Sequence, residues 1–118
     1  LLRETPSDDS ATDKPARERP IRCRSCSAAV TYQQFRTEIA GSHTHQVTNP
    51  QGVEFVISCF STADGCLPVG QPYRRHSWFR GYQWQVAHCR QCGAQLGWFF
   101  SDGPTNPLYA LIINRLQH

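Results

Sequence analysis

The stretch HCRQCGAQLGWF, residues 88–99, contains a Cys-x-x-Cys turn that is followed directly by glycine. A second pair of the same spacing, Cys23 and Cys26, lies near the other end of the chain. Such a turn lets two thiolates converge on one ion, and two turns complete a tetrahedral site. Four soft thiolate ligands favour zinc or iron, and this pairing favours zinc over disulfides or free thiols. We therefore predict one zinc ion that joins the first hairpin of the domain to the last, with the ligands Cys23, Cys26, Cys89 and Cys92.

This predicted zinc ion has a structural role, because four protein ligands leave no open position for a substrate or water. Cys59 and Cys66 remain outside the site. One interpretation is that Cys59 is a small buried hydrophobic residue and Cys66 a loop cysteine. The alternative is a redox pair, which would make the protein a thiol enzyme, but neither residue has an evident activating cation beside it in the chain.

The sequence between and after the cysteine pairs favours β-structure. Residues 53–60 alternate with a period of two and are rich in β-branched and aromatic side chains, which predicts a strand covered on both faces. Residues 82–89 and 95–100 are two further strand candidates, and residues 108–116 fit either a strand or a short helix. The segments are separated by turn signals at Asn49-Pro50-Gln51-Gly52, Asp64-Gly65, Arg80-Gly81 and Asp102-Gly103-Pro104. Short strands with frequent turns predict a small all-β domain.

Length and composition limit the possible classes of protein. A chain of 118 residues with 39% hydrophobic residues predicts one domain with a modest core, which metal binding would stabilise. The net charge of +3 is small for a dedicated nucleic-acid-binding protein. No apolar run reaches the roughly 18 residues of a membrane span, and there is no apolar signal-peptide core. We expect a cytoplasmic protein that binds neither nucleic acid nor membrane.

Residues 1–20 combine Pro, Asp, Ser, Lys and Arg with almost no aliphatic side chains after Leu2. Such a segment cannot bury enough apolar surface to offset its ordering entropy. We therefore predict a disordered N-terminal tail over residues 1–20 and a folded domain over residues 21–118.

Three tryptophans, Trp78, Trp84 and Trp98, lie within about twenty residues of the second cysteine pair. They could fill the core, as tryptophan often does, or converge on one pocket. Trp78 lies among polar and turn-forming neighbours, where complete burial is not expected. Gly97 precedes Trp98, and glycine in a strand often marks close approach by a ligand or by another backbone segment. Both interpretations remain open at this level.

A longer pattern contains these tryptophans and both cysteine pairs. It consists of Asn49-Pro50 with Gly52, His76-Ser77-Trp78-Phe79, Gly81-Tyr82, Trp84, Val86-Ala87, Gly97-Trp98 and Phe100. This pattern resembles the CULT domain, the thalidomide-binding domain of cereblon, from residue 21 to about residue 116. The resemblance implies a β-tent, in which two antiparallel β-sheets pack at a steep angle and are held together by the four-cysteine zinc site. Since only the tail precedes it, we expect a stand-alone bacterial cereblon-like protein, without the region that joins cereblon to a ubiquitin ligase adaptor.

The same resemblance implies a non-enzymatic binding domain with an aromatic cage for cyclic imides. It carries over Trp78, Trp84 and Trp98 as walls and Phe100 as the base. Hydrogen bonds to the imide would come from the loop His76-Ser77-Trp78, largely through its backbone. The remaining implied contacts are Asn49 and Pro50 at the projecting part of the ligand and Phe55 at the rim. The implied ligands are glutarimides such as thalidomide, uracil-like rings such as uridine, and proteins that carry a cyclic-imide modification.

Three other functions remain as alternatives. A thiol enzyme of the methionine sulfoxide reductase type would share a zinc-containing β architecture and would need Cys59 as its reactive residue. An aromatic cage for methylated amines fits the indoles, but such cages commonly add an acidic rim, and residues 66–100 contain no Asp or Glu. Stacking of nucleic-acid bases on the indoles is the third alternative.

Overall fold

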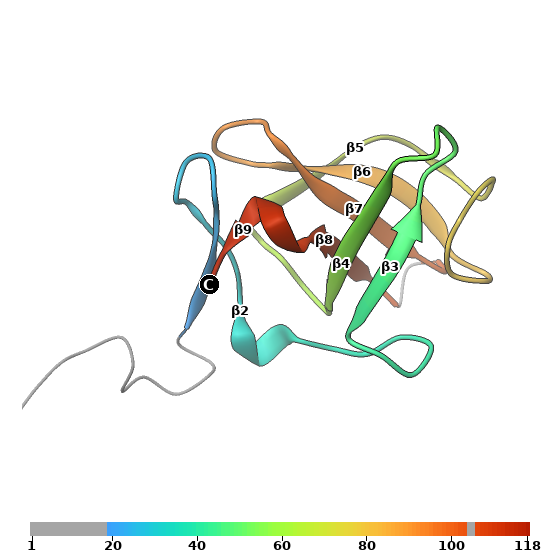
Figure 1. The fold of residues 1–118 in the computed structure, drawn as a ribbon, viewed down its shortest axis with the longest axis horizontal. Helices are drawn as coiled ribbons and strands as arrows, with labels where there is room; N and C mark the ends of the chain where they lie inside the picture. The colour runs from blue at the N-terminus through green and yellow to red at the C-terminus, as the bar shows by residue number, and fades with distance from the viewer. Residues whose placement is uncertain (1–18, 104–105) are drawn as a thin grey trace, which may run out of the picture.

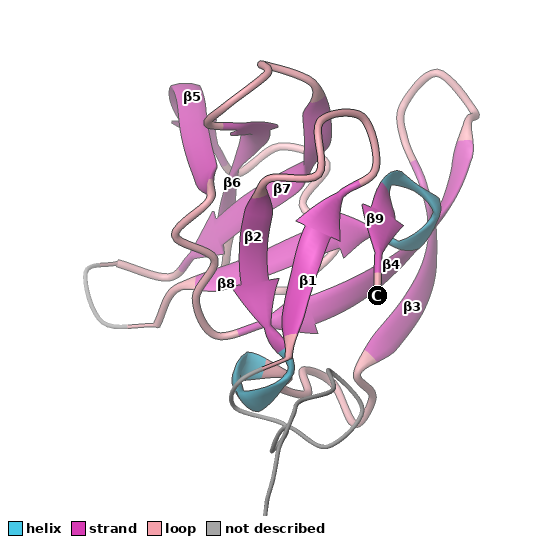
Figure 2. Cartoon of the chain, turned by 90° about the vertical axis from the view of Figure 1, so that its left-hand side faces the viewer, coloured by secondary structure: helices cyan, strands magenta, loops and turns pink. Residues whose placement is uncertain are grey.

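The computed structural model describes residues 19–103 and 106–118, which form two antiparallel β-sheets (Figures 1 and 2). The smaller sheet has the order β2-β1-β9 and consists of β1 (Pro20–Cys23), β2 (Ala29–Tyr32) and β9 (Leu116–Gln117). The larger sheet has the order β3-β4-β8-β7-β6-β5 and consists of β3 (Thr44–Thr48), β4 (Glu54–Phe60), β5 (Cys66–Tyr73), β6 (Gln83–Cys89), β7 (Gln95–Ser101) and β8 (Leu108–Ile112). The predicted all-β class with two antiparallel sheets is confirmed.

The strand predictions agree with the structure in position, with one refinement, but the predicted cover on both faces of residues 53–60 is wrong at Glu54 and Val56, which are exposed. Residues 53–60, 82–89 and 95–100 correspond to β4, β6 and β7. Residues 108–116 are neither one strand nor one helix, because β8 is followed by a short 3-10 helix, η4 (Ile113–Arg115), and then by β9. Ile112 pairs with Ile57 in the larger sheet, and Leu116 pairs with Cys23 in the smaller sheet. The 3-10 turn therefore carries the chain from one sheet to the other.

The predicted turns connect the strands of the larger sheet. The Asn49–Gly52 turn joins β3 to β4, and Asp64-Gly65 directly precedes β5. Arg80-Gly81 lies in the loop before β6, and Asp102-Gly103 follows β7, whereas Pro104 lies outside the described residues. Gly97 in β7 has no space for a side chain, because a Cβ there would overlap the carbonyl oxygen of Ala110 in β8. The glycine before Trp98 thus reflects close approach of a neighbouring strand.

The core is divided into two clusters that lie at different positions along β7. Leu96 belongs to a cluster with Ile21, Phe60 and Leu116, which fills the space between the two sheets. Trp98 and Phe100, on the same face of β7, belong to a second cluster within the larger sheet. One strand therefore joins the buried region near the cysteines to the buried region near the tryptophans.

The first strand of the described chain begins at the end of the segment that was predicted as a tail. β1 begins at Pro20, which pairs with Tyr32, one residue before the predicted start of the domain. Residues 1–18 of the predicted tail lie outside the described residues. The helices among the described residues are single 3-10 turns, η3 (Gln33–Phe35) and η4, which are too short to cross a membrane.

Candidate functional site

The four cysteines of the predicted metal site lie together at the junction of the two sheets. Their Sγ atoms all lie within 4.8 Å of one another. The Sγ atoms of Cys23 and Cys92 are 3.8 Å apart, and those of Cys26 and Cys89 are 3.6 Å apart. A disulfide would require about 2.05 Å, so all four are free thiols. This arrangement of four thiols fits a metal ion, and it links the β1–β2 turn to the β6–β7 turn. The second turn does not belong to the last hairpin, contrary to the prediction, because β7 and β8 continue the larger sheet.

The two cysteine turns share one backbone conformation. The carbonyl of Cys23 accepts a hydrogen bond from the N–H of Ser27, and that of Cys89 accepts one from Gly93 in the same way. Ser27 has φ 66° and Gly93 has φ 81°, so each turn ends in a left-handed residue. Glycine adopts this conformation without strain, which explains why glycine follows the second cysteine pair.

Hydrogen bonds within the second turn favour the thiolate form of Cys89. Desolvation raises the pKa of this thiol, but hydrogen bonds from the backbone of Cys92 and Gln91 outweigh it and lower the pKa to about 7. A thiolate, rather than a thiol, is the form that binds a metal. The hydrogen bonds of this turn therefore favour the metal-binding form of Cys89, whereas burial raises the pKa of Cys23 in the first turn.

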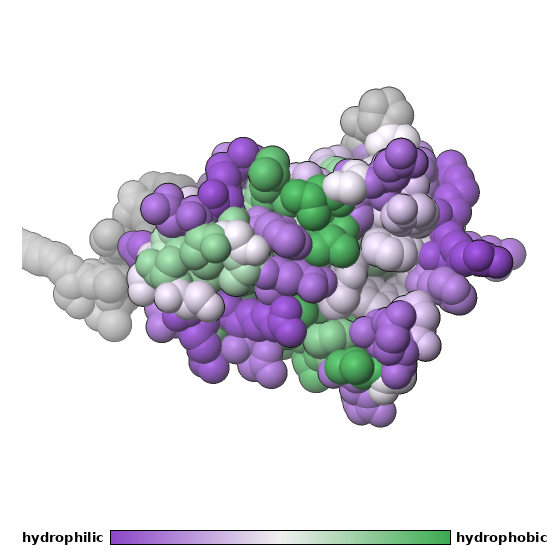
Figure 3. Space-filling model, turned by 90° about the horizontal axis from the view of Figure 1, so that it is seen from above, coloured by the Kyte–Doolittle hydropathy of each residue, from purple (hydrophilic) through white to green (hydrophobic). Residues whose placement is uncertain are grey.

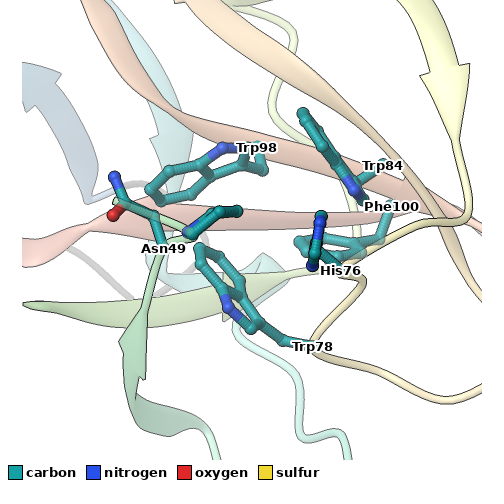
Figure 4. A pocket seen from close by; sticks show the side chains of 7 residues that line it. Asn49, His76, Trp78, Trp84, Trp98 and Phe100 are labelled. Atoms are coloured by element: carbon teal, nitrogen blue, oxygen red, sulfur yellow. The ribbon is translucent and has the colours of Figure 1, made fainter. Parts of the chain in front are cut away.

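The second feature is an aromatic cavity of about 280 Å³, part of it open to solvent. It lies between the β3–β4 turn, the β5–β6 loop and strands β6 and β7 (Figure 4). Its lining residues are Asn49, Pro50, His76, Trp78, Trp84, Trp98 and Phe100. The structure thus brings seven of the nine predicted ligand-binding residues around one cavity.

The strand register explains how these side chains meet. Trp84 in β6 pairs with Phe100 in β7, and Val86 pairs with Trp98. Residues that pair directly in antiparallel strands share a face of the sheet, so all four side chains lie on the same face. Trp78 reaches this face from the β5–β6 loop.

The three indoles are not equivalent. Trp78 and Trp98 contact each other edge to face, with ring centroids 4.6 Å apart and an angle of 82° between the planes. Among the described residues, Trp84 makes no ring contact with either of them, and instead contacts Tyr73 at 5.4 Å. The cavity therefore opens between Trp84 and the other two indoles, with His76 beside it and Phe100 behind (Figure 4).

Two of the indole N–H groups hold the cavity together. Trp78 Nε1 donates a hydrogen bond to the carbonyl of Thr48 at 3.0 Å, and Trp84 Nε1 donates one to the carbonyl of Arg75 at 2.7 Å. The first bond ties the β5–β6 loop to the end of β3, and the second ties it to β6. In the described part of the chain, Trp98 Nε1 has no hydrogen-bond partner.

The loop at His76 presents polar backbone groups beside the cavity. His76 has φ 63°, a left-handed conformation that is strained for a residue with a Cβ and is common at ligand sites. Among the residues that the structure describes, none hydrogen-bonds to the backbone C=O of His76 or to the backbone N–H of Trp78. These two residues line the cavity and retain one free acceptor and one free donor between them.

Two predicted site residues do not line the cavity. Phe55 packs edge-on against Trp98, with ring centroids 5.2 Å apart, and the Arg115 guanidinium lies over its ring. The Ser77 hydroxyl donates a hydrogen bond to the carbonyl of Phe79 at 3.0 Å. Both residues support the cavity from outside.

Asn49 has a role in its own turn. Its Oδ1 accepts hydrogen bonds from the backbone N–H groups of Gln51 and Val53. Only its amide NH2 group is left to face a ligand.

The supporting contacts of Thr48 and Tyr73 were missed from the sequence. Thr48 contributes only a backbone carbonyl, for which no side-chain signal exists. Tyr73 could have been found from the register of the β5–β6 hairpin, since it pairs with Trp84.

Cys59 is fully buried in the cluster that contains Trp98. Burial raises the pKa of its thiol to about 11, so the thiol is protonated at neutral pH. A buried, protonated thiol lacks the activation that a reactive cysteine needs.

Comparison with known proteins identifies cereblons among the relatives of this chain, although no protein-family model matches it. A stretch of 53 residues, 45% of the chain, is 40% identical to 12% of cereblon from Danio rerio. A stretch of 32 residues, 27% of the chain, is 53% identical to 7% of cereblon from Gallus gallus. Over 84 residues, 66% of the chain, it is 36% identical to 14% of cereblon from Drosophila melanogaster. The chain thus spans less than a sixth of the length of these relatives, and it is homologous to cereblon over part of its own length.

Proposed function

We propose that this cereblon-like domain is a non-enzymatic binding domain whose aromatic cavity takes cyclic imides, such as glutarimides of the thalidomide type and uracil-like rings. One observation carries the proposal. Three indoles and Phe100 surround a small cavity beside the free backbone C=O of His76 and the free backbone N–H of Trp78. The homology to cereblon and the residue pattern of its ligand-binding domain support the same function.

A cyclic imide matches both the aromatic side chains and the polar backbone groups that surround the cavity. A flat or partly saturated ring gains dispersion and apolar burial from indole faces. Its N–H lies between two carbonyls, and these groups need hydrogen-bonding partners once they leave water. The His76 carbonyl can accept from the imide N–H, and the Trp78 N–H can donate to an imide carbonyl. Binding therefore needs no charged group in the cavity.

We also propose that the four-cysteine cluster holds one zinc ion with a structural role. Zinc–sulfur bonds of about 2.3 Å in a tetrahedron place the sulfur atoms about 3.8 Å apart. The two Sγ–Sγ distances of 3.6 and 3.8 Å fit this value. When bound, the ion supplies a cross-link between the two sheets, and the cysteine side chains are its complete set of ligands.

The proposed partners share the imide edge, which is the N–H group of the ring with a carbonyl on each side. A free small molecule and a protein that carries a cyclic-imide modification both present it. The methylated-amine alternative has less support, because no lining residue of the cavity is acidic. The thiol-enzyme alternative would need the buried, protonated thiol of Cys59.

Alanine substitution of each indole tests the proposal. We expect Trp78→Ala, Trp84→Ala and Trp98→Ala each to abolish binding of thalidomide in isothermal titration calorimetry. Tyr32→Ala is the matched control, since Tyr32 is an exposed aromatic residue of β2 in the smaller sheet. Circular dichroism of each variant separates lost binding from lost folding. Normal binding by all three folded tryptophan variants would overturn the proposed site.

A further inference from the structure

A basic segment lies beside the aromatic cavity. The β5–β6 loop carries Arg74, Arg75 and Arg80, which are named here the arginine rim. All three are exposed, and the structure gives their guanidinium groups no ion pair or hydrogen bond with any described residue. Residues 66–101 contain no Asp or Glu, so the loop has no acidic neighbour in sequence to neutralise it.

The arginine rim is attached directly to the cavity. The carbonyl of Arg75 accepts the 2.7 Å hydrogen bond from Trp84, which forms one wall. The next residue, His76, lines the cavity itself. Arg74 is held in the same turn, since its carbonyl accepts a hydrogen bond from the N–H of Ser77. The side chains of Arg74 and Arg75 therefore extend from the backbone beside the cavity, and Arg80 follows in the same loop. Hydrophilic residues cover much of the surface seen in Figure 3.

None of the acidic residues of the described chain forms an ion pair with the arginine rim. The four are Glu38, Glu54, Asp64 and Asp102. Glu54 accepts a hydrogen bond from the Gln46 side chain, and Asp102 accepts one from Asn106. An arginine without a protein partner presents a planar fork of donors that suits a carboxylate or a phosphate.

We propose that the arginine rim selects cyclic imides whose substituent outside the cavity carries a carboxylate or a phosphate. The inference rests on the proposed function, because the imide ring must first occupy the cavity. Its substituent then leaves through the mouth and passes the β5–β6 loop. An anionic substituent gains the attraction of the rim, and a neutral one of the same size does not.

The expected preference is modest and depends on salt. An ion pair between exposed groups is worth up to about fivefold in affinity. Screening shortens the range of the attraction from about 10 Å at 0.1 M salt to about 3 Å at 1 M. We therefore expect charged ligands to bind about fivefold more tightly than neutral ones at low salt and equally at 1 M salt.

Two matched pairs of ligands test the inference by calorimetry. The first compares uridine 5′-monophosphate with uridine. The second compares 3-aminoglutarimide acylated with succinic acid against the corresponding primary amide, which has the same shape without the charge. A preference within the first pair alone assigns the rim to phosphate, and one within the second pair alone assigns it to carboxylate. Equal binding within both pairs at low salt overturns the inference and leaves the proposed function intact, whereas failure of all four ligands overturns both.

Substitution of Arg75 tests whether the arginine rim causes the preference for anionic ligands. Arg75→Gln should remove most of the preference, measured as the ratio of charged to neutral ligand affinity within the same variant. The ratio cancels any change in the Trp84 wall, which the Arg75 carbonyl supports. Arg75→Lys should retain much of the preference. Arg36→Gln is the matched control, since it removes the same charge at η3, where Arg36 contacts Gln33. An equal loss in Arg36→Gln would mean that net charge, rather than the rim, causes the preference, and the inference would be overturned.

Discussion

The hydrogen bond from Trp84 to the Arg75 carbonyl gives a sharp test of how the cavity is built. This bond, at 2.7 Å, joins strand β6 to the loop that carries the free backbone groups of His76 and Trp78. Replacing Trp84 with 3-benzothienylalanine keeps the bicyclic ring and substitutes sulfur for the N–H group. The perturbation therefore removes one donor and leaves the aromatic wall in place.

The free energy lost with this hydrogen bond depends on whether water can reach the Arg75 carbonyl. Arg75 is exposed, so water can hydrate its carbonyl once the indole donor is lost. The net loss is then that of an ordinary hydrogen bond, about 1 kcal/mol. If loss of the hydrogen bond disorders the loop in the unbound protein, ligand binding has to order the loop again. The free energy of about 1 kcal/mol then makes the Kd about fivefold weaker. We expect this weakening for a glutarimide, measured by calorimetry.

The same replacement at the other two tryptophans supplies matched comparisons. Trp78 donates to the Thr48 carbonyl, so its replacement should also weaken binding. Trp98 Nε1 has no partner in the described part of the chain, so its replacement should leave the Kd unchanged. Parent-like affinity of the Trp84 variant, or a larger loss in the Trp98 variant, would refute the role assigned to these hydrogen bonds.

Three further predictions concern the scaffold. Removal of the metal by a chelator, or Cys26→Ser, should unfold the domain, because metal binding contributes on the order of 10 kcal/mol and a typical domain has about 5–15 kcal/mol of stability; a metal-free protein with native circular dichroism would contradict this. Gly97→Ala should lower the thermal midpoint strongly, since its Cβ would overlap the β8 backbone, and an unchanged midpoint would show that β8 can move. Burial raises the pKa of Cys59 from 9.0 to about 11, so the folded state holds this proton more tightly than the unfolded state. The contribution of the Cys59 proton to stability is complete below pH 9 and is lost as the pH rises to 11. The urea midpoint should therefore fall between pH 9 and pH 11 less in Cys59→Ala than in the parent protein. An equal fall in both proteins would contradict the raised pKa of Cys59.

Much of the fold could be predicted from the sequence, because the relevant signals are local. The spacing within each cysteine pair belongs to a single turn, and the convergence of the pairs follows from the chemistry of a four-thiolate site. The alternation of residues 53–60 and the flanking turns likewise predict β4 directly. The segment 108–116 was ambiguous because its last residues leave one sheet for the other, and this depends on pairing with residues near the N-terminus.

The candidate site was predictable to the extent that its members are side chains in a recognisable pattern. The tryptophans, His76 and Asn49 have such a pattern. The carbonyls of Thr48 and Arg75 do not, since every residue supplies a backbone carbonyl and only the fold decides which one meets an indole. Gly97 illustrates the same limit, because its sequence context allowed a ligand or a strand as its close neighbour, and the structure places β8 there.

The most direct test of the central claim is a titration of intrinsic tryptophan fluorescence with glutarimide, uridine and N-methylated glutarimide. All three indoles of the chain lie at the cavity, so each can report on occupancy. We predict saturable quenching by the two ligands that have an imide N–H and none by the N-methylated control, which cannot donate to the His76 carbonyl. Equal responses to all three, or no response to any, would contradict recognition of the imide edge by this cavity.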